Sequence, residues 1–321
     1  MTETLLSVRN LQVRFRSREH AVPAVERVSF DLASGRTLGI VGESGSGKSV
    51  TSLAVLGLVP PPGEIAAGEI WFEGRDLTKL DRPALRKIRG ARIGMIFQDP
   101  MTSLNPFLRV ADQIVEITRL HLGHSRSEAG QHAVKMLEMV GIPDARSRAG
   151  AYPHQFSGGM RQRVMIAMAL ACHPKLLIAD EPTTALDVTI QAQILELMRN
   201  LRDRIGTSMI LITHDLGIVA GVADHVIVMY AGRVFESAPA AELFQNPQSP
   251  YTRALLACTP DPALRGAMLR TITGLPPDPA RLDGSRCPFA DRCPEAIGRC
   301  HIEYPPYHSV GENHSVLCWL R

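Results

Sequence analysis

The stretch that decides the fold is TLGIVGESGSGKS, residues 37–49. Its apolar first half predicts a buried strand, and its glycine-rich second half fits the phosphate-binding pattern G-x-x-x-x-G-K-S. The residues that follow have the apolar content of a helix, so the unit is strand, loop and helix. In such a unit the loop N–H groups hold phosphate oxygens, Lys48 reaches the β- and γ-phosphates, and the Ser49 hydroxyl reaches Mg²⁺. We expect the phosphates of ATP to be held by Gly42, Glu43, Ser44, Gly45, Ser46, Gly47, Lys48 and Ser49.

Two acids that follow a second apolar run, LLIA, complete a nucleotide site. Asp180 would stand at the carboxyl end of a parallel strand beside the loop, where it can hold Mg²⁺ through water. Glu181 faces the other way and can polarise an attacking water. Glu181 and Pro182 could simply end the strand, but two adjacent carboxylates at a sheet edge are unfavourable without a cation. We therefore expect hydrolysis here.

The bulk composition restricts the class of protein. With 321 residues, 45% of them apolar, and a net charge of +3, the chain can form one large or two modest globular domains. No dense Lys/Arg run stands apart from acidic neighbours, so no nucleic-acid partner is expected. The N-terminus MTETLLSVRNLQVRF fits neither a signal peptide nor a bilayer-spanning run. We expect a cytosolic protein that reaches a membrane only through a partner.

Strand and helix patterns alternate along most of the chain. Strand candidates fill residues 4–42 and recur at GEIWFEG and RIGMIFQ, after which residues 100–170 are mostly helical. Strands return at KLLIAD, SMILIT and HVIVMY with helical patterns between them, which predicts an α/β fold with a parallel sheet. Beyond residue 245 the sequence is Pro-rich and irregular, which predicts a small stapled module or a flexible extension.

A second glycine-rich turn, FSGGMRQR at residues 156–163, suggests that two chains share the nucleotide. With the phosphate loop and the acidic pair, it makes the chain resemble the ATPase subunit of an ATP-binding cassette (ABC) transporter. The resemblance implies a P-loop NTPase fold of the ABC type, with a RecA-like core, an antiparallel β subdomain and a helical subdomain at about residues 100–170. We expect the ATPase domain over residues 1–245 and a C-terminal extension over residues 246–321.

The resemblance also gives this second turn a role. Ser157, Gly158, Gly159 and Met160 would form the signature motif, which contacts the γ-phosphate of ATP held by the opposite subunit. Phe156 and Met160 stand where the family usually has Leu and Gln. This departure leaves the Ser-Gly-Gly cradle intact.

Four further positions match motifs of the same family. Gln98 resembles the Q-loop glutamine that senses Mg²⁺ and water, and Asp187 resembles the D-loop aspartate that crosses the dimer interface. His214, just after SMILIT, resembles the switch histidine that contacts the γ-phosphate and supports the glutamate. Phe15 resembles the aromatic that stacks on adenine, although an aromatic in an alternating strand is also a common core residue. The residues expected around Mg²⁺ are thus Ser49, Gln98 and Asp180.

Three stretches narrow the resemblance to ATPase subunits of oligopeptide/dipeptide importers. They are FQDPMTSLNP at residues 97–106, YPHQFSGGMRQRV at residues 152–164, and GLPPDP with CPFADRCP in the tail. In that family an extracytoplasmic peptide-binding protein delivers cargo to two integral permeases, and two identical or paralogous ATPases work at the cytoplasmic face of the membrane. The implied function is ATP-driven import of di- or oligopeptides, and nickel chelates or other small solutes remain open as cargo.

Two classes of non-transport ABC ATPase share these motifs. DNA-repair ATPases insert long coiled coils between the phosphate loop and the acidic motif, whereas about 130 residues without sustained heptads separate Lys48 from Asp180. Ribosome-associated ABC proteins carry two cassettes in one chain, and this sequence has no internal repeat. Transport is therefore favoured over both.

Four of the six cysteines gather near the C-terminus. Some peptide-importer ATPases similar to this chain carry a [4Fe-4S] cluster, and two of the four cysteines precede proline, as Fe–S ligands often do. The candidate ligands are Cys287, Cys293, Cys300 and Cys318. The alternatives are four free thiols, or zinc bound with a neighbouring histidine, which would be His301, His308 or His314. Cys172 and Cys258 lie in apolar runs and are expected to be buried and inert.

Overall fold

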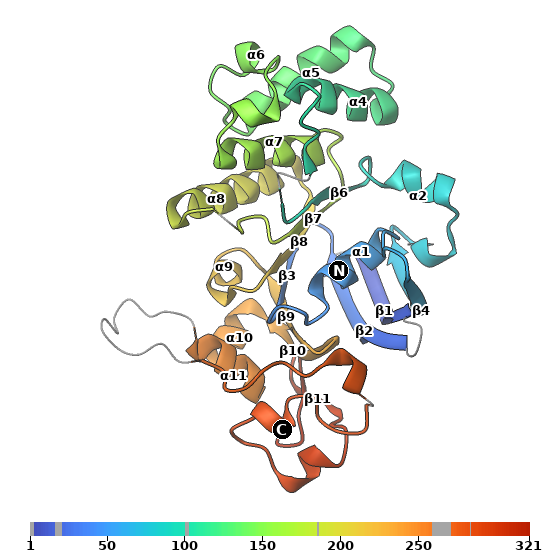
Figure 1. Cartoon of the computed structure of the whole chain (residues 1–321), viewed down its shortest axis with the longest axis vertical. Helices are drawn as coiled ribbons and strands as arrows, with labels where there is room; N and C mark the ends of the chain where they lie inside the picture. The colour runs from blue at the N-terminus through green and yellow to red at the C-terminus, as the bar shows by residue number, and fades with distance from the viewer. Residues whose placement is uncertain (1–2, 17–20, 100–102, 185, 259–270, 283) are drawn as a thin grey trace.

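The computed structural model in Figure 1 describes most of the chain. The described residues are 3–16, 21–99, 103–184, 186–258, 271–282 and 284–321. Two sequence expectations fall partly outside them. Residues 100–102 belong both to FQDPMTSLNP and to the segment expected to be helical, and residue 185 lies close to the expected D-loop aspartate.

The centre of the molecule is an eight-stranded sheet with the order β11-β12-β10-β9-β3-β8-β7-β6. Strands β9, β3, β8, β7 and β6 run parallel, and every residue of β3, β7 and β8 is buried. Continuous apolar runs form such strands because other elements cover both faces of the sheet. The parallel strands are β3 Thr37–Val41, β6 Ile93–Ile96, β7 Leu176–Asp180, β8 Ser208–Thr213 and β9 His225–Tyr230.

A second sheet of four antiparallel strands, with the order β2-β1-β4-β5, lies beside helix α1 in Figure 1. Leu6 and Ile70 from this sheet share one buried apolar cluster with Ile40 and Ile210 of the central sheet. This shared core holds β3, the strand that leads into the phosphate loop. The elements are β1 Thr4–Arg16, β2 Ala21–Ala33, β4 Gly63–Phe72, β5 Arg75–Asp76 and α1 Lys48–Val55.

Helices α4, α5, α6 and α7 gather at the top of Figure 1, away from the antiparallel sheet. Helix α5 starts with a capping box, in which Ser125 Oγ accepts a hydrogen bond from Glu128 N and the Glu128 carboxylate accepts one from Ser125 N. The bounds are α4 Val110–Leu122, α5 Arg126–Met139, α6 Ala145–Arg148 and α7 Gly158–Leu170. The α/β fold with parallel, antiparallel and helical parts is therefore confirmed.

The remaining helices are shorter or lie along the central sheet. The α-helices are α2 Arg82–Ile88, α8 Val188–Ile205, α9 Leu216–Ala220, α10 Ala240–Gln245 and α11 Pro250–Ala257. The 3₁₀ helices are η1 Leu77–Lys79, η2 Pro153–Gln155, η3 Pro279–Arg281, η4 Ala290–Arg292 and η5 Gly298–His301. Within the described part of the chain, none of the helices has the length and apolarity that crossing a membrane requires.

The C-terminal extension is more ordered than its Pro-rich sequence suggests. Strands β11 Tyr307–Gly311 and β12 His314–Leu317 form a hairpin, and β12 pairs with β10 Arg233–Pro239, so that the extension continues the central sheet. Phe289 and Leu317 are buried in the same apolar cluster as Tyr230. The hairpin was missed because its residues are mostly polar and each strand is very short.

Candidate active site

The glycine-rich loop lies between β3 and α1 and packs tightly against neighbouring backbone. A Cβ atom at Gly42 would stand 2.1 Å from Met229 O, and one at Gly47, where φ is +97°, would stand 2.6 Å from Ala24 O. Only glycine fits at either place. At Gly45 a Cβ would meet no described atom within 4 Å. The loop is therefore closely held on one side and open on the other, as a phosphate cradle requires.

Lys48 is folded back into this loop. Its Nζ donates hydrogen bonds to Gly42 O at 2.8 Å and to Glu43 O at 2.9 Å. Burial lowers the pKa of Lys48, while the negative charges of Glu181, Asp180 and Glu43 oppose that shift. An ammonium held among carboxylates in a buried site is suited to bind a polyphosphate.

Two of the residues expected around Mg²⁺, Ser49 and Asp180, meet at the carboxyl end of β7, while Gln98 contacts the next residue, Glu181. Ser49 Oγ donates to Asp180 Oδ1 at 3.0 Å, and Asp180 is almost fully buried. Burial raises the pKa of Asp180, and the Ser49 hydrogen bond opposes that shift. Ser46 Oγ is also buried and has no hydrogen-bond partner among the described residues. A buried carboxylate fits a site for a cation, and an unpartnered buried hydroxyl in the phosphate loop fits a site for an anion.

Three groups converge on one oxygen of Glu181. Its Oε2 lies 3.2 Å from Gln98 Nε2, 3.3 Å from His214 Nδ1 and 2.9 Å from Thr184 Oγ1. The Glu181 backbone is left-handed, with φ of +46°, which is uncommon for a residue with a side chain and occurs often at functional sites. Sequence reasoning named Gln98 and His214 but missed Thr184, whose position three residues after Glu181 was the available signal.

The signature turn and the D-loop aspartate lie on other elements. Ser157 is the N-cap of α7, and its Oγ accepts from Met160 N at 3.4 Å. Asp187 is the N-cap of α8, and its Oδ1 accepts from Ile190 N at 2.9 Å. A Cβ added at Gly159 would stand 3.0 Å from Ile190 Cγ2, so the two helix starts are close. Ser157 and Asp187 are both exposed, and in the described contacts neither joins the cluster around Glu181.

Phe15 lies on β1 of the antiparallel sheet. It is half-buried on β1, pairs with Val22 and Gly63, and packs against the apolar cluster between the two sheets. A Cβ at Gly63 would stand 2.6 Å from Phe15 Cε1, so the ring lies directly over that glycine. The ring therefore has a packing role in the sheet.

The four C-terminal cysteines line one cavity of about 20 Å³. All of them are free thiols. Burial raises the pKa of Cys287 to about 12, with the neighbouring thiols adding to the shift, and burial also raises the pKa of Cys293 and of Cys318. Among the described residues, no group of three or more His, Cys, Asp or Glu is arranged to hold a metal ion. The four thiols are thus gathered but do not form a preset metal site.

Two of the three histidines considered for zinc have other partners, whereas His308 Nε2 is buried with no hydrogen-bond partner among the described residues. His314 Nε2 lies 2.8 Å from Glu236 Oε1, and His301 Nδ1 lies 3.5 Å from Asp291 Oδ1. Cys172 is buried, and burial raises its pKa to about 11, as expected for an inert thiol. Cys258, also expected to be buried, is partly exposed.

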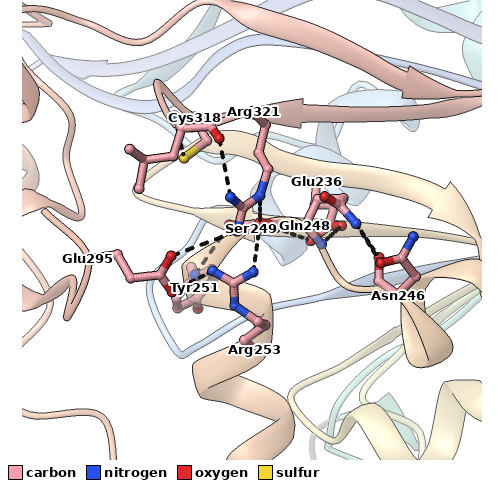
Figure 2. Close-up of polar contacts among 10 residues, drawn as sticks. Glu236, Asn246, Gln248, Ser249, Tyr251, Arg253, Glu295, Cys318 and Arg321 are labelled. Carbon is pink, nitrogen blue, oxygen red and sulfur yellow. Dashed lines mark hydrogen bonds and ion pairs between the residues drawn. The ribbon is translucent and has the colours of Figure 1, made fainter.

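The wall around the cysteine cavity is tied to α11 by charged side chains. Figure 2 shows Arg253 of α11 and the C-terminal Arg321 converging on Glu295, which follows Cys293 by two residues. Both arginines also donate to Gln248 O, Arg321 at 3.0 Å and Arg253 at 3.4 Å. The cysteine-containing part of the extension is therefore tied to α11 and Gln248 at the start of the extension.

Comparison with known proteins places the chain in a family. The family "ABC transporter" matches residues 25–184, and the family "Oligopeptide/dipeptide transporter, C-terminal region" matches residues 235–300. The dipeptide transport ATP-binding protein DppD of Bacillus subtilis is 52% identical over 99% of this chain and 95% of its own length. The oligopeptide transport ATP-binding protein OppD of Haemophilus influenzae is 50% identical over 98% of this chain and 97% of its own length.

Solved structures extend the comparison to the fold. A dimer of the ATP-binding cassette MJ0796, in a post-hydrolysis state with ADP and Pi, matches with a TM-score of 0.66 and 28% identity. The match covers 74% of this chain and 99% of that one. With the full-length likeness to DppD and OppD, these matches show that the chain belongs to the ABC transporter family, among the ATP-binding proteins of oligopeptide/dipeptide transporters.

Proposed function

We propose that this chain is the ATP-hydrolysing subunit of an ABC transporter that imports di- or oligopeptides. The observation that carries the proposal is the juxtaposition of two adjacent carboxylates with their expected partners. Asp180 lies 3.0 Å from Ser49 Oγ, and Glu181 is contacted by both Gln98 and His214. The sequence separates these residues by up to about 165 positions, and the fold brings them to one edge of the sheet.

In this proposal the loop 42–49 binds the phosphates of ATP through its N–H groups, and Lys48 turns outward to the β- and γ-phosphates. Ser49 and Asp180, together with Gln98, would hold Mg²⁺, which when bound withdraws charge from the β- and γ-phosphate oxygens. Glu181 orients the attacking water and takes up its proton as the water oxygen bonds to the γ-phosphorus. The bond from the γ-phosphorus to the bridging oxygen then breaks, and ADP and phosphate result.

The signature turn supports a partner subunit. Ser157, Gly158, Gly159 and Met160 would contact the γ-phosphate of ATP on a second ATPase, with Asp187 crossing the interface. Supporting this, Ser157 and Gly158 are exposed at the N-terminus of a thirteen-residue helix, where N–H groups attract anions. The second ATPase would be a copy of this chain or a paralogue. For Phe15 we propose contact with adenine from its place on β1.

An apolar groove supports docking to a membrane permease. A hollow of about 260 Å³ lies between the central sheet and the helical part, and Leu58, Phe97, Ile117 and Met168 are among its lining residues. Phe97 is 42% exposed and precedes Gln98 directly. We propose that a helix of the permease fills the groove, so that a movement of this helix displaces Phe97 and with it Gln98. The ATPase would then lie at the cytoplasmic face of the membrane, beneath two permeases that receive peptide from an extracytoplasmic binding protein.

The gathered cysteines support a second component of the proposal. Four thiols on one cavity, two of them before proline, have the chemistry of a Cys₄ ligand set. We propose that Cys287, Cys293, Cys300 and Cys318 hold a [4Fe-4S] cluster that staples the extension. Protein purified without oxygen should then be brown and contain iron and acid-labile sulfide. A colourless protein that contains zinc, or no metal, would refute the cluster.

Transport assays test the main proposal. The chain, its permeases and its partner ATPase are reconstituted in vesicles with the binding protein, and uptake of a labelled dipeptide is followed with and without ATP. We expect ATP-dependent uptake that Lys48→Ala abolishes. If only nickel were taken up in an ATP-dependent way, the cargo would be nickel rather than peptides. If the rate of ATP hydrolysis were the same with and without the permeases, a non-transport ATPase would be favoured.

A further inference from the structure

The C-terminal extension contacts the phosphate loop directly. Arg292, at the end of η4, donates from Nη1 to Glu43 Oε2 at 2.6 Å and from Nη2 to Glu43 Oε1 at 2.9 Å. Glu43 is the second residue of the phosphate loop, and Arg292 lies between Asp291 and Cys293 in the cysteine-rich segment. The Arg292 side chain is only 6% exposed. Because the ion pair is bidentate and largely buried, it fixes both the distance and the orientation of the Glu43 carboxylate relative to Arg292.

Arg292 is held rigidly by the groups around it. Its Nε donates to Thr273 O at 3.1 Å, and its Nη1 also donates to the Tyr230 hydroxyl at 3.1 Å. The guanidinium carbon lies 5.7 Å from the ring centroid of Tyr230 and 6.0 Å from that of Phe289. The hydrogen bonds to Glu43 raise the pKa of Arg292, so the side chain stays charged. All three guanidinium nitrogens are therefore engaged, and the charge cannot move away from Glu43.

Glu43 is bound through its backbone as well as its side chain. Its N–H donates to the hydroxyl of the buried Tyr251 at 3.1 Å, and its carbonyl accepts from Lys48 Nζ at 2.9 Å. Tyr251 belongs to α11, and its ring lies 4.6 Å from that of Tyr230, centroid to centroid. The first part of the phosphate loop is thus positioned by residues from outside the strand–loop–helix unit.

The charge of Glu43 makes its partner important for function. A carboxylate in the phosphate loop repels a triphosphate, and in a partly buried site the repulsion is much stronger than in water. Arg292 neutralises this carboxylate and holds it on the side of the extension. Arg286 lies in the same segment and makes two hydrogen bonds of 3.1 Å to Asp291. Its side chain is exposed, and in the described contacts it pairs with Asp291 and not with Glu43.

We propose that Arg292 is a positioning residue for ATP binding, through which the C-terminal extension neutralises Glu43 and holds the phosphate loop open for the nucleotide. This inference rests on the proposed assignment of residues 42–49 to the phosphates of ATP. It gives the extension a direct part in the ATPase cycle that does not depend on what the cysteines bind.

The first test compares ATP affinity of full-length variants and turnover in the assembled transporter. Arg292→Ala should raise the Kd and the KM for ATP about tenfold or more, because a bidentate charged contact is lost and Glu43 is left unpaired, while kcat changes less than about threefold. Arg286→Ala, the matched control, should leave Kd within about twofold, as expected for an exposed pair. An unchanged Kd in Arg292→Ala, or equal losses in both variants, would overturn the proposal.

A second test separates positioning from general stability. In a Glu43→Gln background, Arg292→Ala should change Kd less than about threefold, because no carboxylate remains to be neutralised. Arg292→Lys keeps the charge but cannot make the bidentate contact, so its Kd for ATP should lie between those of the wild type and Arg292→Ala. This variant provides the test if Arg292→Ala is insoluble. Equal effects of Arg292→Ala in both backgrounds, or an Arg292→Lys variant with unchanged Kd, would refute positioning. If Lys48→Ala left Kd unchanged, the assignment of the loop itself would fail instead.

Discussion

The Oε2 atom of Glu181 lies 3.3 Å from Nδ1 of His214, at the meeting point of β7 and the loop after β8. Gln98, which follows β6, and Thr184 donate to the same oxygen. One carboxylate oxygen is therefore oriented by groups from three separate segments of the chain. Such an arrangement fixes the direction in which Glu181 can accept a proton from water.

Replacing this carboxylate should stop hydrolysis but not binding. Glu181→Gln keeps the shape of the side chain and removes its basicity, so steady-state phosphate release should fall about 100-fold or more. ATP affinity should stay within about threefold because Lys48 and the phosphate loop are intact, and an ATP-bound dimer with the partner should accumulate. Gel filtration with ATP and a phosphate-release assay measure both effects. Glu196→Gln, on the exposed side of α8, is the control, and unchanged turnover in Glu181→Gln would disprove the role.

Removing the groups that orient Glu181 should have graded effects. His214→Ala removes a ring 3.3 Å from the carboxylate, and turnover should fall about 10- to 100-fold with little change in ATP affinity. Thr184→Val removes one hydroxyl donor while Gln98 and His214 remain, so a loss of about two- to fivefold is expected. Single-turnover measurements with saturating ATP separate this loss from slow product release. A larger loss in Thr184→Val than in His214→Ala would contradict the proposed order.

The sequence predicted the parts of the site that depend on local backbone. The glycine-rich pattern predicts a buried strand before the phosphate loop and a helix after it, and the structure has β3 and α1 at these places. The continuous apolar run before Asp180 likewise predicts a buried strand, which is β7. The contact of Arg292 could not be predicted, because it depends on how segments distant in sequence pack together, and an arginine 249 positions away from Glu43 leaves no periodic signal. Thr184 lies only three residues after Glu181, so its contact was within reach of sequence reasoning.

The fold of the C-terminal extension also could not be predicted in full from the sequence. Its prolines and glycines indicated turns, but the pairing of β12 with β10 is set by partners such as Glu236 and Val316 rather than by strand propensity. The segment also buries Phe289 against Tyr230 and Tyr251, which composition alone does not reveal. Tertiary packing decided the structure of this segment.

A bulky charge at the signature turn should damage the partner's ATP site first. Ser157→Arg removes the N-cap of α7 and places a long side chain where a second subunit would bring its γ-phosphate. In a complex with a distinguishable partner, ATP trapped by the partner should fall about tenfold or more, while ATP bound by this chain's own loop should change less than about threefold. Photolabelling of each subunit measures the two separately. Ser147→Arg, exposed on α6, is the control, and an equal loss at both sites would reject the trans assignment.

The buried pair of Glu236 and His314 should be a main anchor of the extension. Glu236 is fully buried and accepts hydrogen bonds from Gln248 N at 2.6 Å and Ser249 N at 3.0 Å as well as contacting His314. Glu236→Ala leaves these groups unpaired and should reduce the free energy of unfolding by about 3–5 kcal/mol.

Urea unfolding of the full chain measures this loss. Glu303→Ala breaks the exposed pair of Glu303 with Arg299 and should cost less than about 1 kcal/mol. Equal midpoints for the two variants would show that Glu236 does not anchor the extension.

Acid should destabilise the chain through His225. Burial, and secondly the neighbouring His314, lower the pKa of His225 in the folded state, and its Nε2 lies 2.8 Å from Ser237 Oγ. The unfolded chain therefore takes up this proton first as the pH falls below about 6.5, and folding stability declines from there down to the folded pKa. Each unit of pH in that window removes up to about 1.4 kcal/mol for this one group.

Two variants isolate this contribution among the other histidines. Burial lowers the pKa of His121 and His173 as well, so the wild-type chain should lose stability below pH 6.5 through several groups with the same sign. His225→Asn should flatten the dependence of unfolding free energy on pH between about 6.5 and 5, whereas His154→Asn, exposed on η2, should not. If His225→Asn and the wild type lose stability in parallel over this range, protonation of His225 is not coupled to unfolding.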